Sequence, residues 1–139
     1  MTADGPMTTG NATILYVEDD ADVRETVELL LDALGYRLII ATNAVEAYGL
    51  LCDTEGVDLL FSDVVMPGGM NGVELAERAR DLRPGLKVVL TSGYSDAVLK
   101  LKASQLSGVH WLAKPFQFDD LARAIRDALD GVPAPPPPD

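Results

Sequence analysis

Short apolar runs alternate with amphipathic helical patterns along residues 13–130, and this alternation limits the fold more than any other feature of the chain. The apolar runs predict strands at 13–17, 36–41, 57–62, 86–91 and 109–113. Apolar residues spaced three or four apart predict helices at 21–34, 43–52, 73–82, 95–104 and 118–129. Regular alternation of strand and helix predicts an α/β domain, in which a parallel sheet carries helices on both faces.

The strand order follows from the connections. Right-handed crossovers and five strand–helix units favour the flavodoxin-like order 2-1-3-4-5. The run 57–62 is apolar on both faces, as a central parallel strand needs to be. Gly35 is expected to end the first helix, and Asn43 with Glu46 resembles a capping box at the start of the second. We therefore expect one domain at 13–130, between an irregular N-terminus at 1–12 and a flexible proline-rich tail at 131–139.

The charge of the chain restricts its partners. Its formal net charge is -11, from 22 acidic and 11 basic residues, and such a surface repels nucleic acid and anionic lipid. The sequence contains neither an apolar stretch as long as a membrane span nor the pattern of a signal peptide. We therefore expect a cytoplasmic protein that binds neither nucleic acid nor membranes. The single cysteine, Cys52, lies among apolar residues, and we expect a buried thiol without a redox role.

Polar side chains follow or end four of the predicted strands. They are Glu18, Asp19 and Asp20 after the first strand, Asp63 after the third, Thr91 at the end of the fourth, and Lys114 after the fifth. Such sheets bind ligands beyond the carboxyl ends of the strands, near the point where strand order reverses, so these groups are expected to converge. Carboxylates held close together repel one another, and a hard divalent cation relieves that repulsion. Because the ligands are oxygen atoms, we expect Mg²⁺ as the cofactor.

Asp63 is the best candidate for a nucleophile, because it stands alone after the central strand. A carboxylate beside Mg²⁺ can attack a phosphoryl group and form an aspartyl phosphate. Catalysis of that transfer consists mainly of positioning and of stabilising negative charge, which Mg²⁺, Lys114 and the Thr91 hydroxyl can supply. Glu18 and Asp19 are then the pair that holds the metal.

These residues lie within four short motifs. The motifs are Leu15-Tyr16-Val17-Glu18-Asp19-Asp20, Ser62-Asp63-Val64-Val65-Met66-Pro67, Leu90-Thr91-Ser92-Gly93 and Lys114-Pro115-Phe116. Each motif alone is a weak signal, but four in order, each at a strand end, are highly specific. Together they resemble the signatures of the response-regulator receiver domains of two-component signalling, over roughly residues 13–130.

The resemblance implies a role in phosphoryl transfer for several positions. Asp63 would accept phosphate from the phosphohistidine of a sensor histidine kinase or of a phosphotransfer protein. Glu18, Asp19, Asp63 and the backbone carbonyl of Val65 would hold Mg²⁺. The chain would catalyse its own phosphorylation and dephosphorylation only, and would not otherwise be an enzyme.

The resemblance also implies a switch. Thr91 would hydrogen-bond a phosphate oxygen and shift on activation. Lys114 would pair with the phosphate, and its peptide bond to Pro115 would be cis. Trp111 would occupy the aromatic switch position, which turns inward on activation.

Two departures from the common receiver pattern concern loops. The loop after Pro67 is one residue longer than usual, and the extra glycine would loosen a segment beside the metal site. Gly93 and Tyr94 follow Ser92, where many receivers have a small residue and an acidic one. Both forms are similar to those of receivers fused to hybrid histidine kinases.

Several of these residues also have simpler interpretations. Asp20 is expected to cap the helix that follows it, and Glu18 and Asp19 could do the same. Lys114 could be a turn residue and Thr91 could satisfy local backbone, while Trp111 and Phe116 could serve packing alone. His110 is expected to be an exposed strand residue and not a phosphodonor.

Two other functions fit a sheet of this kind less well. A haloacid-dehalogenase-type phosphatase needs a second carboxylate two residues after the nucleophile, where this chain has Val65. A flavodoxin-type electron carrier needs a hydroxyl-rich phosphate loop after the first strand, where three acidic residues would repel the flavin phosphate.

The expected output is a contact with a downstream protein, since we expect no DNA-binding output domain after residue 131. We expect the contact surface at 95–104, 109–113 and 118–129, because Thr91 and Trp111 lie there. Homodimerisation through that surface is an alternative that no residue pattern supports. The sequence leaves open whether the chain is a stand-alone receiver, a detached hybrid-kinase module or a phosphate sink.

Overall fold

The computed structural model describes residues 12–66, 69–92, 106 and 108–133. Strands and helices alternate along these residues. The strands are β1 (Thr13–Val17), β2 (Arg37–Ala41), β3 (Leu59–Asp63), β4 (Lys87–Ser92) and β5 (Val109–Ala113). The helices are α1 (Ala21–Ala33), α2 (Ala44–Asp53), α3 (Gly72–Leu82) and α5 (Phe118–Asp130). The helix predicted at 95–104 lies outside the described residues.

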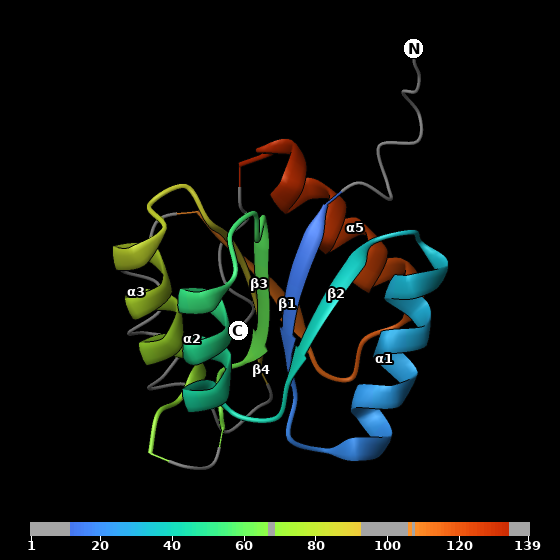
Figure 1. Ribbon diagram of the computed structural model, residues 1–139. Helices are drawn as coiled ribbons and strands as arrows, with labels where there is room; N and C mark the ends of the chain where they lie inside the picture. Colours follow the sequence, from blue (N-terminus) through green and yellow to red (C-terminus); the bar gives the residue numbers. More distant parts are fainter. Residues whose placement is uncertain (1–11, 67–68, 93–105, 107, 134–139) are drawn as a thin grey trace.

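The strands form one parallel sheet in the order β2-β1-β3-β4-β5, which confirms the predicted fold. In Figure 1, α2 and α3 lie on one side of the sheet and α1 and α5 on the other. Because all strands point the same way, their carboxyl ends lie along one edge. That edge, next to the reversal of strand order between β1 and β3, is where a ligand site is expected.

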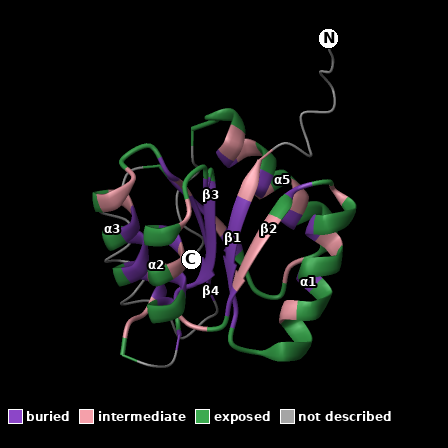
Figure 2. Cartoon of the chain, in the orientation of Figure 1, coloured by how far each residue is buried: buried purple, intermediate pink, exposed green. Residues whose placement is uncertain are grey.

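The core has two parts, one on each face of the sheet. Residues of α2 and α3 pack on β1, β3 and β4 in one cluster, and residues of α1 and α5 pack on the same strands in the other. All five residues of β3 are buried, as its central place in the sheet demands. Figure 2 shows the buried strands between helices whose outer faces are exposed.

The predicted element boundaries differ from the structure by a few residues at most. Asp63 and Ser92 were expected just after their strands, but each is the last residue of its strand, because Asp63 pairs in register with Thr91 and Ser92 with Ala113. Gly35 follows α1 with a φ of 89°, in the left-handed region that glycine adopts readily.

The capping box predicted at α2 forms only in part. The Asn43 side chain accepts a hydrogen bond from the amide of Glu46, at 2.8 Å. The Glu46 carboxylate turns instead to Thr42, accepting from its amide at 2.6 Å and from its hydroxyl at 3.1 Å. A complete capping box occurs at α3, between Asn71 and Glu74.

Two predictions of burial were wrong. Cys52 was expected to be buried, but it is exposed, because α2 turns this position away from the sheet while Ala47 and Leu51 face it. His110 was expected to be exposed, but it is only 6% exposed, because the end of α5 covers it and its Nε2 atom lies 3.0 Å from the Val132 carbonyl oxygen. In both cases tertiary packing decided what the local pattern could not.

Within the described residues, none of the helices has the length and apolar character needed to cross a lipid bilayer.

Candidate functional site

The predicted site residues meet at the carboxyl edge of the sheet. Asp63 ends the central strand β3, Glu18 and Asp19 follow β1 directly, and Lys114 follows β5. A cavity of about 900 Å³ is lined by all four of these side chains. The sheet therefore brings together residues that lie up to 96 positions apart in the chain, from 18 to 114.

The carboxylate of Asp63 is buried and held from two sides. Its side chain is 9% exposed, and its Oδ1 atom accepts a hydrogen bond from the amide of Val65 at 3.1 Å. Its Oδ2 atom accepts from the ammonium group of Lys114, which forms an ion pair with it. Asp63 is therefore oriented toward the cavity with a cation already beside it, an arrangement that stabilises negative charge on its oxygen atoms.

The backbone beneath Asp63 is fixed by α3. Gly72, the first residue of that helix, donates its amide to the carbonyl of Val64 at 2.9 Å. A Cβ atom at Gly72 would lie 2.0 Å from the carbonyl oxygen of Asp63 and 2.9 Å from Cα of Val64. Only glycine lets the helix approach the strand this closely, so Gly72 sets the position of the Asp63 backbone.

Glu18 is the most buried acidic side chain of the cavity, at 7% exposure. Loss of hydration on burial raises its pKa, the charges of Asp63 and Asp19 raise it further, and the Asp20 amide and Lys114 oppose these effects. The carboxylate accepts from the Asp20 amide at 3.1 Å. A buried carboxylate with a raised pKa is one that a divalent cation would stabilise in its ionised form.

The chain around Glu18 is held by α1. Asp20 is the N-cap of α1, as predicted, and its side chain accepts from the amides of Asp22 and Val23. Arg24 donates from Nη1 to the Glu18 carbonyl at 2.9 Å. The turn between β1 and α1 is therefore constrained on both sides of the acidic pair.

The acidic residues supply the donor atoms for a hard cation but do not enclose one by themselves. Glu18, Asp19 and Asp63 line the same cavity, yet among the described residues no three Asp, Glu, His or Cys side chains are grouped closely enough to hold a metal ion. Their oxygen chemistry fits Mg²⁺, which binds through one or two carboxylates and keeps several water ligands. Backbone oxygen or water would complete such a site.

The remaining predicted residues lie where the sequence placed them relative to the strands. Thr91 is 3% exposed and pairs in register with Asp63. Val65 is 51% exposed. Trp111 is partly buried against the core cluster on the α3 side of the sheet, opposite Leu90. The peptide bond between Lys114 and Pro115 is cis.

One wall of the cavity is apolar. It is formed by Val23, Val27 and Leu30 of α1 together with Phe116 and Phe118. Val23 and Phe118 are each 40% exposed, although both are large apolar residues. Phe116 packs on the core, as expected, with its ring 6.5 Å from that of Phe61.

Comparison with known sequences identifies the family. Residues 14–126 match the family described as the response regulator receiver domain. The chain belongs to this family. The receiver domain described here is 35% identical to the response regulator receiver protein CpdR of Brucella abortus, over 84% of this chain and 95% of CpdR.

Other relatives are longer proteins. The receiver domain is 32% identical to the DNA-binding transcriptional regulator NtrC of Azospirillum brasilense over 86% of this chain, but covers only 24% of NtrC. It is 34% identical to the sensor kinase CckA of Brucella abortus over 87% of this chain, but covers 13% of CckA. The crystal structure of the signal receiver domain of an HD domain-containing protein from Pseudomonas fluorescens superimposes with a TM-score of 0.80 and 31% identity, covering 87% of this chain and 96% of that one.

Two residues that shape the site were not predicted from sequence. Gly72 directly precedes the helix predicted at 73–82 and was not singled out, and neither was Arg24. Asn71, with Glu74 three residues after it, is a sequence signal for a capped helix start. No local pattern, however, reveals that this start packs against the backbone of Asp63.

Proposed function

We propose that the receiver domain accepts a phosphoryl group on Asp63 from a histidine kinase or phosphotransfer protein, in a Mg²⁺-dependent reaction. The observation that carries the proposal is the buried Asp63 carboxylate, paired with Lys114 in a cavity that also contains Glu18 and Asp19. An Asp63 oxygen would form the new O–P bond as the N–P bond of the phosphohistidine breaks. The departing imidazole would keep the bonding pair and take a proton from solvent.

Each neighbouring group has a definite task in this step. Mg²⁺, bound through Glu18, Asp19, Asp63 and the Val65 carbonyl, would offset the charge of the transferring group. Lys114 would remain beside the phosphoryl oxygens, where charge accumulates. Thr91, in register with Asp63, would donate its hydroxyl to a phosphoryl oxygen.

Intact mass measurement tests the reaction. The native chain should gain one phosphoryl group on incubation with acetyl phosphate and Mg²⁺, and should gain none when EDTA is present. The Asp63→Asn variant should gain none under either condition. Asp81→Asn is a matched control, since Asp81 is an exposed aspartate on α3. An adduct that persists in Asp63→Asn would refute the assignment.

We also propose that the apolar wall of the cavity receives the phosphodonor protein. Val23 and Phe118 line the same cavity as Asp63 and are each 40% exposed, so a helix docked between α1 and the start of α5 would bring its histidine to the carboxylate. Partly exposed large apolar side chains beside polar chemistry are typical of protein contact sites. Such a partner explains why the cavity, at about 900 Å³, is larger than a phosphoryl group needs.

A comparison of donors tests this docking site. Phe118→Ala should reduce the rate of transfer from a phosphorylated donor protein about tenfold, because hot-spot aromatic residues contribute that much or more to binding. The rate with acetyl phosphate should stay unchanged. Leu29→Ala is the control, because Leu29 is 71% exposed on α1 but does not line the cavity. Equal loss with both donors would show damage to the site itself.

The output is proposed to be a contact with a downstream protein and not with nucleic acid, in keeping with the net charge of -11. The whole proteins represented by NtrC and CckA contain much more chain than this receiver domain covers. We propose a cytoplasmic protein, with no catalysis beyond its own phosphorylation and dephosphorylation.

A further inference from the structure

A second, smaller cavity lies at the opposite end of the sheet from Asp63. It has a volume of about 360 Å³ and lies between the beginnings of β4 and β5 and the end of α5. Three side chains that can carry positive charge line it: Arg80 from α3, Lys87 at the start of β4, and His110 from β5. Residues 131–133, which follow α5, also line it.

The charge of this cavity is opposite to that of the chain as a whole. Among the described residues that line it there is no aspartate or glutamate, although the chain has twice as many acidic as basic residues, 22 against 11. Four larger or comparable cavities in the described part of the chain are, by contrast, each lined by at least two carboxylates. A cavity lined by cations is therefore not a consequence of composition.

Arg80 is fixed at the wall of the cavity. Its Nε atom donates to the Leu86 carbonyl at 3.3 Å, which holds the guanidinium group in place. Burial lowers the pKa of Arg80 below its usual range, because the charged group has lost part of its hydration. Gly108, with a φ of 75°, lies next to this guanidinium group, since Nη2 would be 3.7 Å from a Cβ atom at that position.

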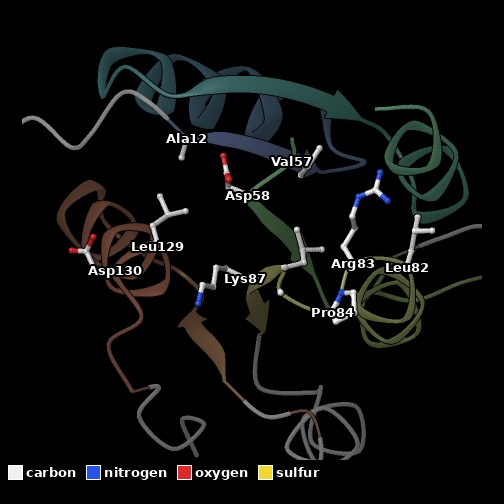
Figure 3. Close-up of a pocket in the computed structure, with 11 residues that line it drawn as sticks. Ala12, Val57, Asp58, Leu82, Arg83, Pro84, Lys87, Leu129 and Asp130 are labelled. Carbon is white, nitrogen blue, oxygen red and sulfur yellow. The ribbon is translucent and has the colours of Figure 1, made fainter. Parts of the chain in front are cut away.

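Lys87 supplies the second charge. Its backbone is anchored, since its amide donates to the Asp58 carbonyl at 3.2 Å. Its ammonium group forms no ion pair within 4.0 Å with any described carboxylate. Figure 3 shows the adjoining cavity, in which the Lys87 side chain extends from β4 toward the side where α5 ends, with Asp58 and Asp130 on the far walls.

The end of α5 does not oppose an anion as strongly as a free helix end would. The carbonyl groups of Ala128 and Asp127 already accept hydrogen bonds from Gly131 and Val132, at 3.3 and 3.0 Å. The Val132 carbonyl accepts from His110, whose Nε2 must then carry the proton. This contact holds the His110 ring at the wall of the cavity, and Arg80 and Lys87 are the residues through which an anion would be bound.

We propose that this cavity binds a small phosphate-bearing anion, held between the guanidinium group of Arg80 and the ammonium group of Lys87. The tetrahedral oxygens of a phosphate can accept from two cations that approach from different elements, here α3 and β4. A volume of about 360 Å³ is near the lower limit of small-molecule sites, so the ligand is a phosphate with at most a small substituent. The site is separate from Asp63 and does not depend on the proposed phosphotransfer.

Titration of the full chain with inorganic phosphate tests the proposal. Divalent cations are left out so that the Asp63 site does not bind phosphate, and ionic strength is kept constant with chloride. The amide resonances of Gly108, His110 and Val132 should shift in a saturable way. Shifts confined to Val64 and Lys114 would place the anion at the phosphorylation site and overturn the proposal, as would the absence of saturation.

Charge variants decide whether the two cations are responsible. Lys87→Gln and Arg80→Gln should each weaken binding about tenfold, as expected for the loss of one charge-assisted hydrogen bond. Lys87→Arg, which keeps the charge, should stay close to the native affinity and guards against a folding defect in the glutamine variants. Arg78→Gln is the matched control, because Arg78 is exposed on the same helix as Arg80. Equal weakening by Arg78→Gln, or binding of acetate as tight as that of phosphate, would contradict a built phosphate site.

Discussion

The ammonium group of Lys114 and the carboxylate of Asp63 form an ion pair across the full width of β4, between residues that lie 51 positions apart in the chain. Asp63 is the last residue of β3, and Lys114 is the first residue after β5. Their pairing depends on three parallel strands that end at the same level. The ion pair therefore links Asp63 directly to the end of β5, the strand that also carries Trp111.

Removal of the Lys114 charge should slow phosphorylation. We expect Lys114→Gln to lower the rate of phosphorylation by acetyl phosphate about 10²-fold, because one preorganised donor at a developing charge contributes this much. The rate is measured by intact mass over time at saturating Mg²⁺. Lys87→Gln is the control, since Lys87 begins β4 at the opposite end of the sheet, and its rate should match that of the native chain. If Lys114→Gln were phosphorylated as fast as the native chain, Lys114 would have no role in the reaction.

Glu18 should make stability depend on pH in the absence of metal. In the folded chain the pKa of Glu18 is raised above its ordinary value of 4.5. Between pH 4.5 and that raised pKa, the folded state therefore binds more protons than the unfolded state. Stability therefore falls as pH rises through this window. Glu18→Gln removes the ionised, poorly hydrated group, and we expect the metal-free variant to be more stable than the native chain at pH 7, by about 1 kcal/mol.

Mg²⁺ should make the native chain more stable than the Glu18→Gln variant. Mg²⁺ binds the ionised carboxylate, so it should stabilise the native chain toward urea and have little effect on Glu18→Gln. The free energy of unfolding is measured for both chains at pH 5 and pH 7, with Mg²⁺ and with EDTA. Identical pH profiles of the two metal-free chains would show that Glu18 is not the group responsible.

Gly72 should tolerate no side chain. A Cβ atom 2.0 Å from the Asp63 carbonyl oxygen must push α3 away from β3, and we expect Gly72→Ala to lower the free energy of unfolding by about 2 kcal/mol or more. Because the displacement reaches the backbone of Asp63, the rate of phosphorylation should fall as well.

Gly49 provides the control for this substitution. It lies within α2, and a Cβ atom there would meet nothing within 4 Å. Gly49→Ala should therefore stabilise the chain by about 0.5–1 kcal/mol, as the higher helix propensity of alanine predicts. If Gly72→Ala and Gly49→Ala changed the denaturation midpoint alike, close packing at Gly72 would not be the cause.

Trp111 should affect the output and not the chemistry. It lies on the face of the sheet that α3 covers, and it is only partly buried. It does not line the cavity that contains Asp63. We expect Trp111→Ala to change affinity for a downstream protein by about tenfold, as aromatic contact residues commonly do, and to leave the rate of phosphorylation within twofold of native. Unchanged partner binding in both phosphorylation states would exclude this surface as the output.

The sequence by itself determined the order of strands and helices. Apolar side chains repeat every two residues in a strand and about every 3.6 residues in a helix, and a short segment is enough to show either spacing. The sequence also placed Glu18, Asp63 and Lys114 at strand ends, and parallel topology then required those ends to share one edge. Only the tertiary structure decided that Lys114 reaches Asp63, that Gly72 packs on the Asp63 backbone, and that His110 is buried while Cys52 is not. These features depend on which surface of one helix or strand packs against another. Such contacts join residues far apart in the chain, so the spacing of apolar residues within a short segment does not reveal them.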